Sequence, residues 1–465
     1  MINIQNDLKP ADLKSRIEKL WDASAPKIFS IAKKYDRSQG SPVYTVKGRY
    51  TTRGWTEWTQ GFEYGAAILQ YDATGNEEAL KYGRESTLKL MAPHLTHMGV
   101  HDHGFNNVST YGNLRRLMRE GKIAHDEWEM HFYELALKLS GACQARRWTR
   151  IRDGSGYIYS FNGPHSLFAD TIRSLRSLAV GHRLGHCLME EGDTRISLLD
   201  RLIQHARTTA RFSVYYGEGR DAYDIRGRTT HEAIFNLNDG NFRCPNSQQG
   251  FSPFTTWTRG LSWILCGYPE ELEFLDTLED SELEPFGGRA EIEGFMRKAA
   301  EAVADFFIEH TPTDGVPYWD TGAPQLHRLG DYLDKPAEPY NDHEPVDSTA
   351  AAICAQGFLR LGRYLQNRAG KTEDDGLRDK GQRYWQAGLT IAKTLFDEPY
   401  LSTDGNHQGL LLHSIYHRPN GWDHIPEGSK IPHSESSMWG DYHARELALY
   451  LQRVIEDGPY YTFFA

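Results

Sequence analysis

The sequence predicts an all-α protein. Apolar residues recur at spacings of three and four along most of the chain, as they do on the buried face of an α-helix. Strand signals are few and short, as at 157–160 and 316–319, and they lie between helical segments. About twelve helical segments follow one another as pairs, without an internal sequence repeat. By helix count alone, a closed ring of hairpins, an α-solenoid and an irregular bundle fit equally well.

The helical segments are placed by their apolar spacing and by the turn residues between them. In chain order they are 13–35, 60–71, 77–91, 127–139, 167–189, 195–212, 257–267, 292–310, 348–366, 377–396, a short one at 409–417, and 439–454. The loop from 215 to 249 is long and polar, but aromatic residues are interleaved in it. Loops of this length in a compact protein are usually functional or disordered, and the aromatics favour an ordered, functional loop.

Composition indicates one large folded unit. A chain of 465 residues with 39% hydrophobic content can bury a large core, and length alone allows one to three domains. No Ser/Gly/Pro tract or long charge block separates two halves of different composition. We therefore expect a single domain over residues 1–465. The five cysteines are scattered, so neither a zinc-ribbon spacing nor a disulfide framework is visible.

The charge balance excludes some partners. A net charge of −11 argues against nucleic acid and against an anionic membrane surface, because both attract basic proteins. The first ten residues lack the basic and apolar regions of a secretion signal, and no later stretch is apolar enough to span a bilayer. We expect a cytoplasmic protein. A homodimer is an oligomeric state that the sequence leaves open.

The most informative stretch is 247–263, which places an amide, an aromatic ring and a guanidinium at a loop-to-helix junction. Gln249 can hydrogen-bond hydroxyl groups, Trp257 offers an apolar face to a pyranose ring, and Arg259 has a planar fork that matches a carboxylate. Such a set suits an anionic sugar. A small anionic substrate is compatible with the acidic chain, because charge beyond about 8–10 Å is screened.

Together with His-Asp-His-Gly-Phe at 101–105 and Ala-Asp-Thr at 169–171, this stretch resembles glycoside hydrolase family 88, the unsaturated glucuronyl hydrolases. Further segments that resemble the family are 58–62, 316–320, 347–352, 411–417 and 434–442. Each motif is weak alone, but all follow the family's order over roughly residues 55 to 454. The resemblance implies an (α/α)6 barrel, in which long loops surround a cleft at one end.

The resemblance assigns the catalytic pair to Asp102 and Asp170. An isolated Asp is usually a helix cap or a solvated side chain, and only the fold can bring together two residues 68 positions apart. Apolar neighbours on both sides of Asp170 favour a raised pKa, which suits an acid/base. The family mechanism implies that Asp170 protonates C4 of a C4=C5 unsaturated uronide and then deprotonates the water that adds at C5. Asp102 would hold the C2 and C3 hydroxyls and raise the pKa of Asp170 through like-charge repulsion.

The resemblance also implies the contacts with the small anionic oligosaccharide substrate. His231 and Arg259 would face the sugar ring and its carboxylate, with Gln249 on the hydroxyls and Trp257 on the sugar face. Trp58 and Ser436 lie in matching segments and complete the predicted substrate-binding set. No metal and no organic cofactor is required for this reaction.

The chain also departs from the family pattern. Glu63 and the residues after it replace a Trp-rich helix start, and His103 replaces the usual Leu. We expect an altered pocket, so the reaction class is better specified than the substrate. The related unsaturated rhamnogalacturonyl hydrolases and a saturated glucuronide hydrolase are alternatives on the same fold.

Two further alternatives come from other functional classes. His97 and His101 could bind a divalent metal as an i, i+4 pair on a helix, although Gly99 would break that helix. A non-catalytic glycan-binding protein on the same ring of helices would also use aromatic clusters. The two acids beside a carboxylate-binding Arg favour an enzyme.

Overall fold

The computed structural model describes residues 1–53 and 58–465. Its α-helices are α1 (Lys14–Lys34), α2 (Gln60–Thr74), α3 (Glu77–Leu90), α4 (His103–Asn107), α5 (Asn113–Arg119), α6 (Glu127–Arg146), α7 (Thr171–Ser174), α8 (Arg176–Arg183), α9 (Leu198–Phe212), α10 (Thr258–Leu275), α11 (Asp280–Leu283), α12 (Arg289–Glu309), α13 (Ser348–Thr372), α14 (Asp375–Leu395) and α15 (Met438–Ile455). A π-helical turn, Val108–Gly112, joins α4 to α5.

The strands are short and lie in the connections. They are β1 (Tyr44–Val46), β2 (Arg49–Thr51), β3 (Trp148–Arg150), β4 (Gly156–Ile158), β5 (Ser166–Phe168), β6 (Cys187–Met189), β7 (Arg195–Ser197), β8 (Glu232–Phe235) and β9 (Phe242–Asn246). The strands form three antiparallel hairpins, β1–β2, β3–β4 and β6–β7, and one three-stranded sheet of order β5-β8-β9.

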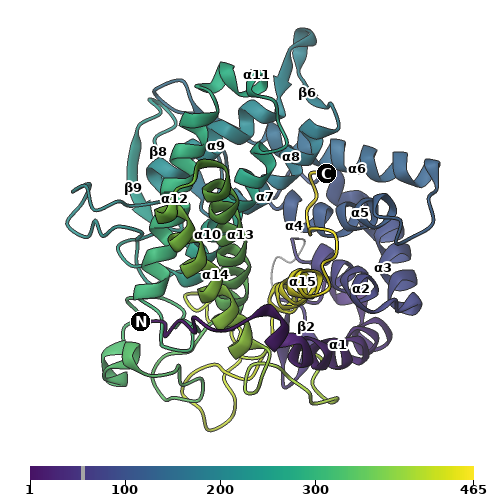
Figure 1. Cartoon of the computed structure of the whole chain (residues 1–465), viewed down its shortest axis with the longest axis vertical. Helices are drawn as coiled ribbons and strands as arrows, with labels where there is room; N and C mark the ends of the chain where they lie inside the picture. The colour runs from purple at the N-terminus through teal and green to yellow at the C-terminus, as the bar shows by residue number, and fades with distance from the viewer. Residues whose placement is uncertain (54–57) are drawn as a thin grey trace.

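The long helices alternate between an outer and an inner layer. The outer layer is α1, α3, α6, α9, α12 and α14, and each is followed by an inner element, namely α2, α4–α5, α7–α8, α10, α13 and α15. Neighbouring inner elements pack against one another all the way round, and α15 closes the ring against α2 (Figure 1). This arrangement is the (α/α)6 barrel that the resemblance implies, so the predicted fold class is confirmed. One domain over residues 1–465 stays a prediction.

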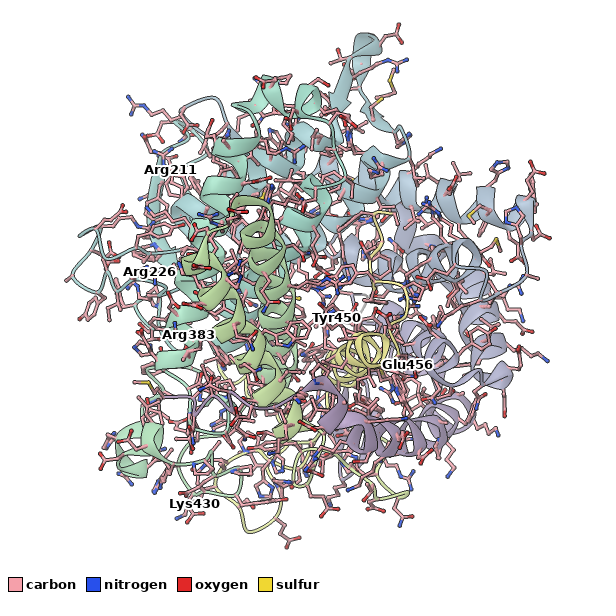
Figure 2. All side chains as sticks on the ribbon, viewed as in Figure 1. Arg211, Arg226, Arg383, Lys430, Tyr450 and Glu456 are labelled. Atoms are coloured by element: carbon pink, nitrogen blue, oxygen red, sulfur yellow. The ribbon has the colours of Figure 1, made fainter. Side chains whose placement is uncertain are left out.

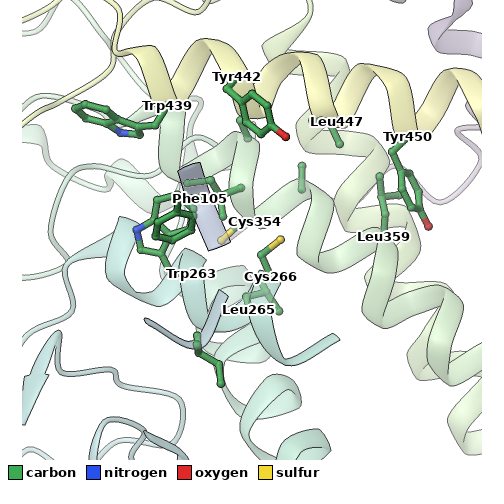
Figure 3. Close-up of a cluster of buried hydrophobic side chains, with 14 of the residues drawn as sticks. Phe105, Trp263, Leu265, Cys266, Cys354, Leu359, Trp439, Tyr442, Leu447 and Tyr450 are labelled. Carbon is green, nitrogen blue, oxygen red and sulfur yellow. The ribbon is translucent and has the colours of Figure 1, made fainter. Parts of the chain in front are cut away.

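Burial explains the two layers. In α10 every residue except Glu273 is buried, and α15 is buried on nearly all sides. Figure 3 shows aromatic and aliphatic side chains of α10, α13 and α15, such as Trp263 and Tyr442, meeting between the inner helices. The periphery carries charged side chains instead, among them Arg211 and Lys430, which point away from the ribbon in Figure 2.

The centre of the ring contains buried ion pairs. Arg173 of α7 binds Glu446 of α15 at 2.7 Å and Glu270 of α10 at 3.0 Å, and all three side chains are inaccessible or nearly so. Arg360 of α13 binds Glu273 of α10 at 2.6 Å. Buried charges of this kind require good partners, since removing one partner leaves the other uncompensated. The network therefore ties four inner elements together below the loops.

Most predicted helices are confirmed within a few residues, but three expectations are wrong. Segment 167–189 is not one helix, because it contains β5, two short helices and β6. Segment 409–417 is not helical, since Leu411 bridges Leu401 and His413 has φ of +65°. At 316–319 no strand forms, and Tyr318 makes only an isolated bridge to Val346. The inner helices α4 and α5 were not predicted. No helix in the described part of the chain is both long and apolar enough to cross a membrane.

Candidate active site

A cleft with about 650 Å³ of empty space opens at one end of the ring. Its lining consists of Trp58, Asp102, Phe105, Phe161, Asp170, Gln248, Gln249, Trp257, Arg259, Trp263, Tyr416, His417 and Trp422. All five site residues predicted from the 101–105, 169–171 and 247–263 motifs, and Trp58, therefore meet in one place, although they come from distant parts of the chain.

The cleft lies at the N-terminal ends of the inner helices. Asp102, Asp170 and Trp257 are the residues that immediately precede α4, α7 and α10. Asp347 and Ser437 immediately precede α13 and α15, and their side chains also accept hydrogen bonds from backbone N–H groups of those helices. The N-terminus of a helix carries a partial positive charge. The barrel thus points several helix N-termini towards a cleft in an otherwise acidic protein.

His101 lies between the two predicted catalytic acids. Its Nε2 is 3.0 Å from Oδ1 of Asp170, and its Nδ1 is 3.8 Å from Oδ2 of Asp102. The imidazole is inaccessible to solvent, and the rings of Phe161 and Phe168 pack on it with centroid distances of 5.7 Å and 5.6 Å. The two acids are therefore linked through one buried imidazole.

The segment that carries His101 and Asp102 is fixed to α7. The carbonyl of His101 accepts hydrogen bonds from Gln144 Nε2 at 2.9 Å and from Ser174 Oγ at 2.7 Å. The N–H of Gly104 donates to the same Ser174 Oγ at 2.9 Å. A Cβ on Gly104 would stand 2.3 Å from the carbonyl oxygen of Ser174, so only glycine allows this approach. The Gly of the 101–105 motif thus sets the distance between the two acids.

Asp170 is placed by the small sheet. Strand β5 pairs with β8, and beyond the last pair the N–H of Ala169 donates to the carbonyl of His231 at 2.8 Å. The chain then turns into α7, so Asp170 follows a strand and starts a helix. This position brings its carboxylate to His101.

The pKa values of the two acids shift in opposite directions, and the shift of Asp170 is opposite to the one expected from the sequence. Burial, together with the neighbouring Asp170, raises the pKa of Asp102 to about 6, although His101 opposes both. Burial would also raise the pKa of Asp170, but His101 outweighs it through charge and hydrogen bonding, so the pKa of Asp170 is lowered. The pKa of His101 is raised, because the two carboxylates outweigh its burial. The expectation of a raised pKa for Asp170 is therefore wrong in the unliganded protein.

Arg259 lines the cleft, but most of its N–H groups already donate hydrogen bonds within the protein. Nη1 donates to Asp347 Oδ2 at 2.5 Å and to the carbonyl of Ile415, and Nη2 donates to the carbonyl of Tyr416 at 2.7 Å. A guanidinium has five N–H donors, so two remain for a ligand. Its charge is shared with Asp347 and with the ring of Trp257, whose centroid is 4.7 Å away. Two parallel hydrogen bonds from Arg259 to a substrate carboxylate stay a prediction.

His231 and Ser436 are placed differently from the other predicted contacts. Burial lowers the pKa of His231 to about 4, so it is neutral at pH 7 and adds no positive charge. Its ring lies between Phe168 and Trp257, and among the residues described its two ring nitrogens have no hydrogen-bond partner. Ser436 is fully buried, and its Oγ donates to the carbonyl of Leu411 at 2.7 Å. Neither is among the residues that line the cleft, so their contact with substrate stays a prediction.

Aromatic rings form most of the cleft wall. Trp58 packs on Trp439 with centroids 4.8 Å apart, and Trp422 lies 5.1 Å from the ring of Tyr416. Sequence reasoning singled out Trp58 but missed Trp422, which stands in an irregular loop without a motif. Trp263 is only 3% exposed, yet it is also one of the residues that line the cleft.

The departures from the family pattern do not reach the cleft. Glu63 binds Arg37 at 2.6 Å and accepts a hydrogen bond from Tyr82 at 2.6 Å, on the outer side of α2. His103 contacts Ser140 Oγ and the carbonyl of His97, each at 3.1 Å. Neither residue is in the described lining, and the altered pocket stays a prediction.

The alternative metal site is not formed as proposed. Residues 98–102 are not helical, so His97 and His101 are not an i, i+4 helical pair. The two nitrogens of His101 face carboxylates instead. Within residues 1–53 and 58–465, no group of three or more His, Cys, Asp or Glu side chains is arranged to hold a metal ion.

Comparisons with known proteins agree with the fold and the motifs. The chain is 26% identical over 428 residues to the unsaturated glucuronyl hydrolase of Bacillus sp. (strain GL1), covering 90% of each protein. It is 22% identical to an unsaturated chondroitin disaccharide hydrolase of Streptococcus pyogenes, covering 87% of this chain and 84% of that protein. No family model matches the chain.

Solved structures extend the likeness to the fold. The crystal structure of the Bacillus sp. GL1 protein superposes with a TM-score of 0.68 at 21% identity, covering 94% of this chain and 97% of that one. An unsaturated glucuronyl hydrolase specific for heparin superposes with a TM-score of 0.69 at 20% identity, covering 96% and 98%. The fold and the cleft define an (α/α)6-barrel protein with two buried acids at the helix N-termini. The resemblance to glycoside hydrolase family 88, the unsaturated glucuronyl hydrolases, is confirmed.

Proposed function

We propose that this protein is a glycoside hydrolase that releases a 4,5-unsaturated uronic acid from the non-reducing end of lyase-generated oligosaccharides. The observation that carries the proposal is the pair Asp102 and Asp170, joined by His101 on the floor of an aromatic cleft. Relatives named unsaturated glucuronyl hydrolase and unsaturated chondroitin disaccharide hydrolase support the reaction class.

The reaction begins with a proton. Protonation of C4 and addition of water at C5 give a hemiketal, which opens and releases the aglycone. Asp170 delivers the proton to C4 and its carboxylate then accepts one from the attacking water, so no net proton is consumed. Asp102 lies on the other side of His101, where its carboxylate can accept hydrogen bonds from sugar hydroxyls.

The cleft is suited to an unsaturated uronide in two ways. Its aromatic wall, which includes Trp58 and Trp257, matches the apolar face of a sugar ring. The N-termini of α10, α13 and α15 and the remaining donors of Arg259 supply positive potential for the uronate carboxylate. A small anionic oligosaccharide is thus the proposed ligand. A cytoplasmic location and a homodimer stay predictions.

The test is a panel of lyase-generated unsaturated disaccharides from glucuronan-type, chondroitin-type, heparin-type and rhamnogalacturonan-type polymers. Turnover is followed as loss of absorbance of the conjugated double bond. We expect cleavage of at least one unsaturated uronide and no cleavage of an ordinary aryl glucoside, which lacks both the double bond and the carboxylate. Activity on the rhamnogalacturonan product alone would identify the protein as an unsaturated rhamnogalacturonyl hydrolase. Binding of these sugars without turnover would make it a glycan-binding protein.

A further inference from the structure

Asp170 presents a difficulty for this reaction, because in the unliganded protein the neighbouring imidazole favours its ionised form. An acid that must protonate C4 needs a proton when the substrate is bound. Among the described residues, one group within hydrogen-bond distance could supply it, namely Nε2 of His101, which lies 3.0 Å from Asp170 Oδ1.

We propose that His101 is a positioning residue that joins Asp102 and Asp170 into one proton-sharing unit and that it holds, on Nε2, the proton that Asp170 delivers to the substrate. This inference rests on the proposed function. It adds a role for a residue that the sequence reasoning assigned only to an alternative metal site.

The first argument is geometric. Both ring nitrogens of His101 face carboxylate oxygens, at 3.0 Å for Asp170 and 3.8 Å for Asp102. A neutral imidazole has one N–H and can donate to only one of them, whereas an imidazolium has two N–H donors. Nδ1 of His101 and Oδ2 of Asp102 are both buried and have no other partner among the described residues. A small closure of this gap would complete a carboxylate–imidazolium–carboxylate unit.

The second argument concerns the charged groups around the unit. Arg147 is a nearby cation that interacts with His101 and with Asp102, while its guanidinium donates hydrogen bonds to the carbonyls of Tyr159, at 3.1 Å, and Ser160, at 2.7 Å. His205 and His231 also interact with the unit, but burial lowers their pKa values to about 3 and about 4, so both are neutral. His101 differs from these two histidines, because the nearby Asp102 and Asp170 outweigh its burial and raise its pKa.

The third argument is the effect of a bound sugar. Covering the cleft excludes water from Asp170, and a drier environment favours a neutral pair over an ion pair. The Nε2–H bond of His101 then breaks and an O–H bond forms on Asp170. This leaves a neutral imidazole and a carboxylic acid, and the net charge of the three residues is unchanged. When Asp170 has protonated C4 and taken a proton from water, the reverse transfer restores the imidazolium.

The test compares two substitutions at His101 with a control histidine. His101→Gln keeps an N–H donor near the position of Nε2, but an amide has no proton to give. His101→Asn places its amide towards Asp102 and loses the bond to Asp170. His103→Gln removes another fully buried imidazole from the same segment, one that contacts Ser140 and His97 and not the acids. Thermal unfolding of all three reports whether they fold.

For folded His101→Gln we expect kcat to fall by about 100-fold or more, as for loss of a proton-transfer group, while KM changes by less than about threefold. In the wild type the shared proton should produce one of the two slopes of the plot of kcat against pH. His101→Gln should lack that slope. His103→Gln should keep kcat within about threefold and keep that slope. A purely structural role predicts that His101→Gln behaves like His103→Gln, and that result would overturn the inference.

An NMR titration of the imidazoles in the unliganded protein separates this inference from the proposed function. We expect His101 to titrate above the ordinary histidine value, and to titrate lower in Asp170→Asn, where one carboxylate is gone. A His101 that stays neutral down to pH 6 would refute proton sharing even if the enzyme is active. If the pKa of His101 is raised but no unsaturated uronide is turned over, the proposed function is refuted, while proton sharing among Asp102, His101 and Asp170 still holds.

Discussion

Replacing Arg259 by Lys tests what this residue does in the protein itself. The guanidinium is 2% exposed and makes three hydrogen bonds, to Asp347 and to the carbonyls of Ile415 and Tyr416. A lysine keeps the charge and can keep the bond to Asp347, but one ammonium cannot also reach both carbonyls. Two hydrogen bonds to a charged donor, each contributing about 1.5–3 kcal/mol, are lost, so we expect destabilisation by about 3–6 kcal/mol.

Urea unfolding at pH 7 measures this change as a shift of the midpoint at constant slope. Arg211→Lys is the control, because that side chain is 61% exposed and pairs with Asp153 at the surface, where we expect less than about 0.5 kcal/mol. If Arg259→Lys loses less than about 1 kcal/mol while KM for the unsaturated uronide rises strongly, Arg259 is mainly a ligand-binding group. The claim that the hydrogen bonds of Arg259 within the protein stabilise the fold would then be refuted.

Two further predictions concern packing and charge. Asp72 is buried against Arg116 at 2.6 Å and Arg453 at 2.9 Å, and these cations hold its pKa well below the usual range despite burial. Asp72→Asn should therefore cost about 3–5 kcal/mol at pH 7. The wild-type advantage is fully present above the unfolded pKa of about 4 and shrinks as the pH falls below it, which urea unfolding at several pH values measures; a difference that persists unchanged at pH 2 would contradict this. Gly104→Ala should lower both Tm and kcat, because its Cβ would meet the Ser174 carbonyl at 2.3 Å, and an active, equally stable variant would contradict the close approach.

The long helices were predictable because each has an apolar face, and α1, α3, α12 and α14 begin and end close to their expected residues. The inner helix α4 escaped prediction because it is buried on every side and continues into a polar π-helical turn, so it has no amphipathic pattern. The segment 409–417 has helical spacing in Leu411 and Ile415, but tertiary contacts hold it in an extended, irregular path. In both cases the environment of the folded ring overrides the local pattern.

The site was predictable only in part. Asp102 and Asp170 come together because β5, which pairs with β8, leads directly into α7, while Ser174 of α7 holds the 101–105 segment; no spacing in the chain expresses that. The resemblance supplied the pair, but the chemistry of the pair depends on His101, whose partners become visible only in three dimensions. Apolar neighbours in sequence predicted a raised pKa for Asp170, whereas the nearest group in space lowers it.

The central claim is that Asp170 gives and takes a proton at the double bond of a bound uronide. The direct measurement is the initial rate of double-bond loss for wild type, Asp170→Asn and Asp102→Asn on the best unsaturated disaccharide, with KM from the same data and disaccharide binding measured by calorimetry. We expect Asp170→Asn to bind within about tenfold of wild type and to show no turnover, because an amide keeps the shape but cannot transfer the proton. Asp102→Asn should keep some turnover with a shifted pH profile, since it changes the charge that His101 and Asp170 experience. Substantial turnover by folded Asp170→Asn, or wild-type cleavage of an ordinary aryl glucoside, would contradict the account.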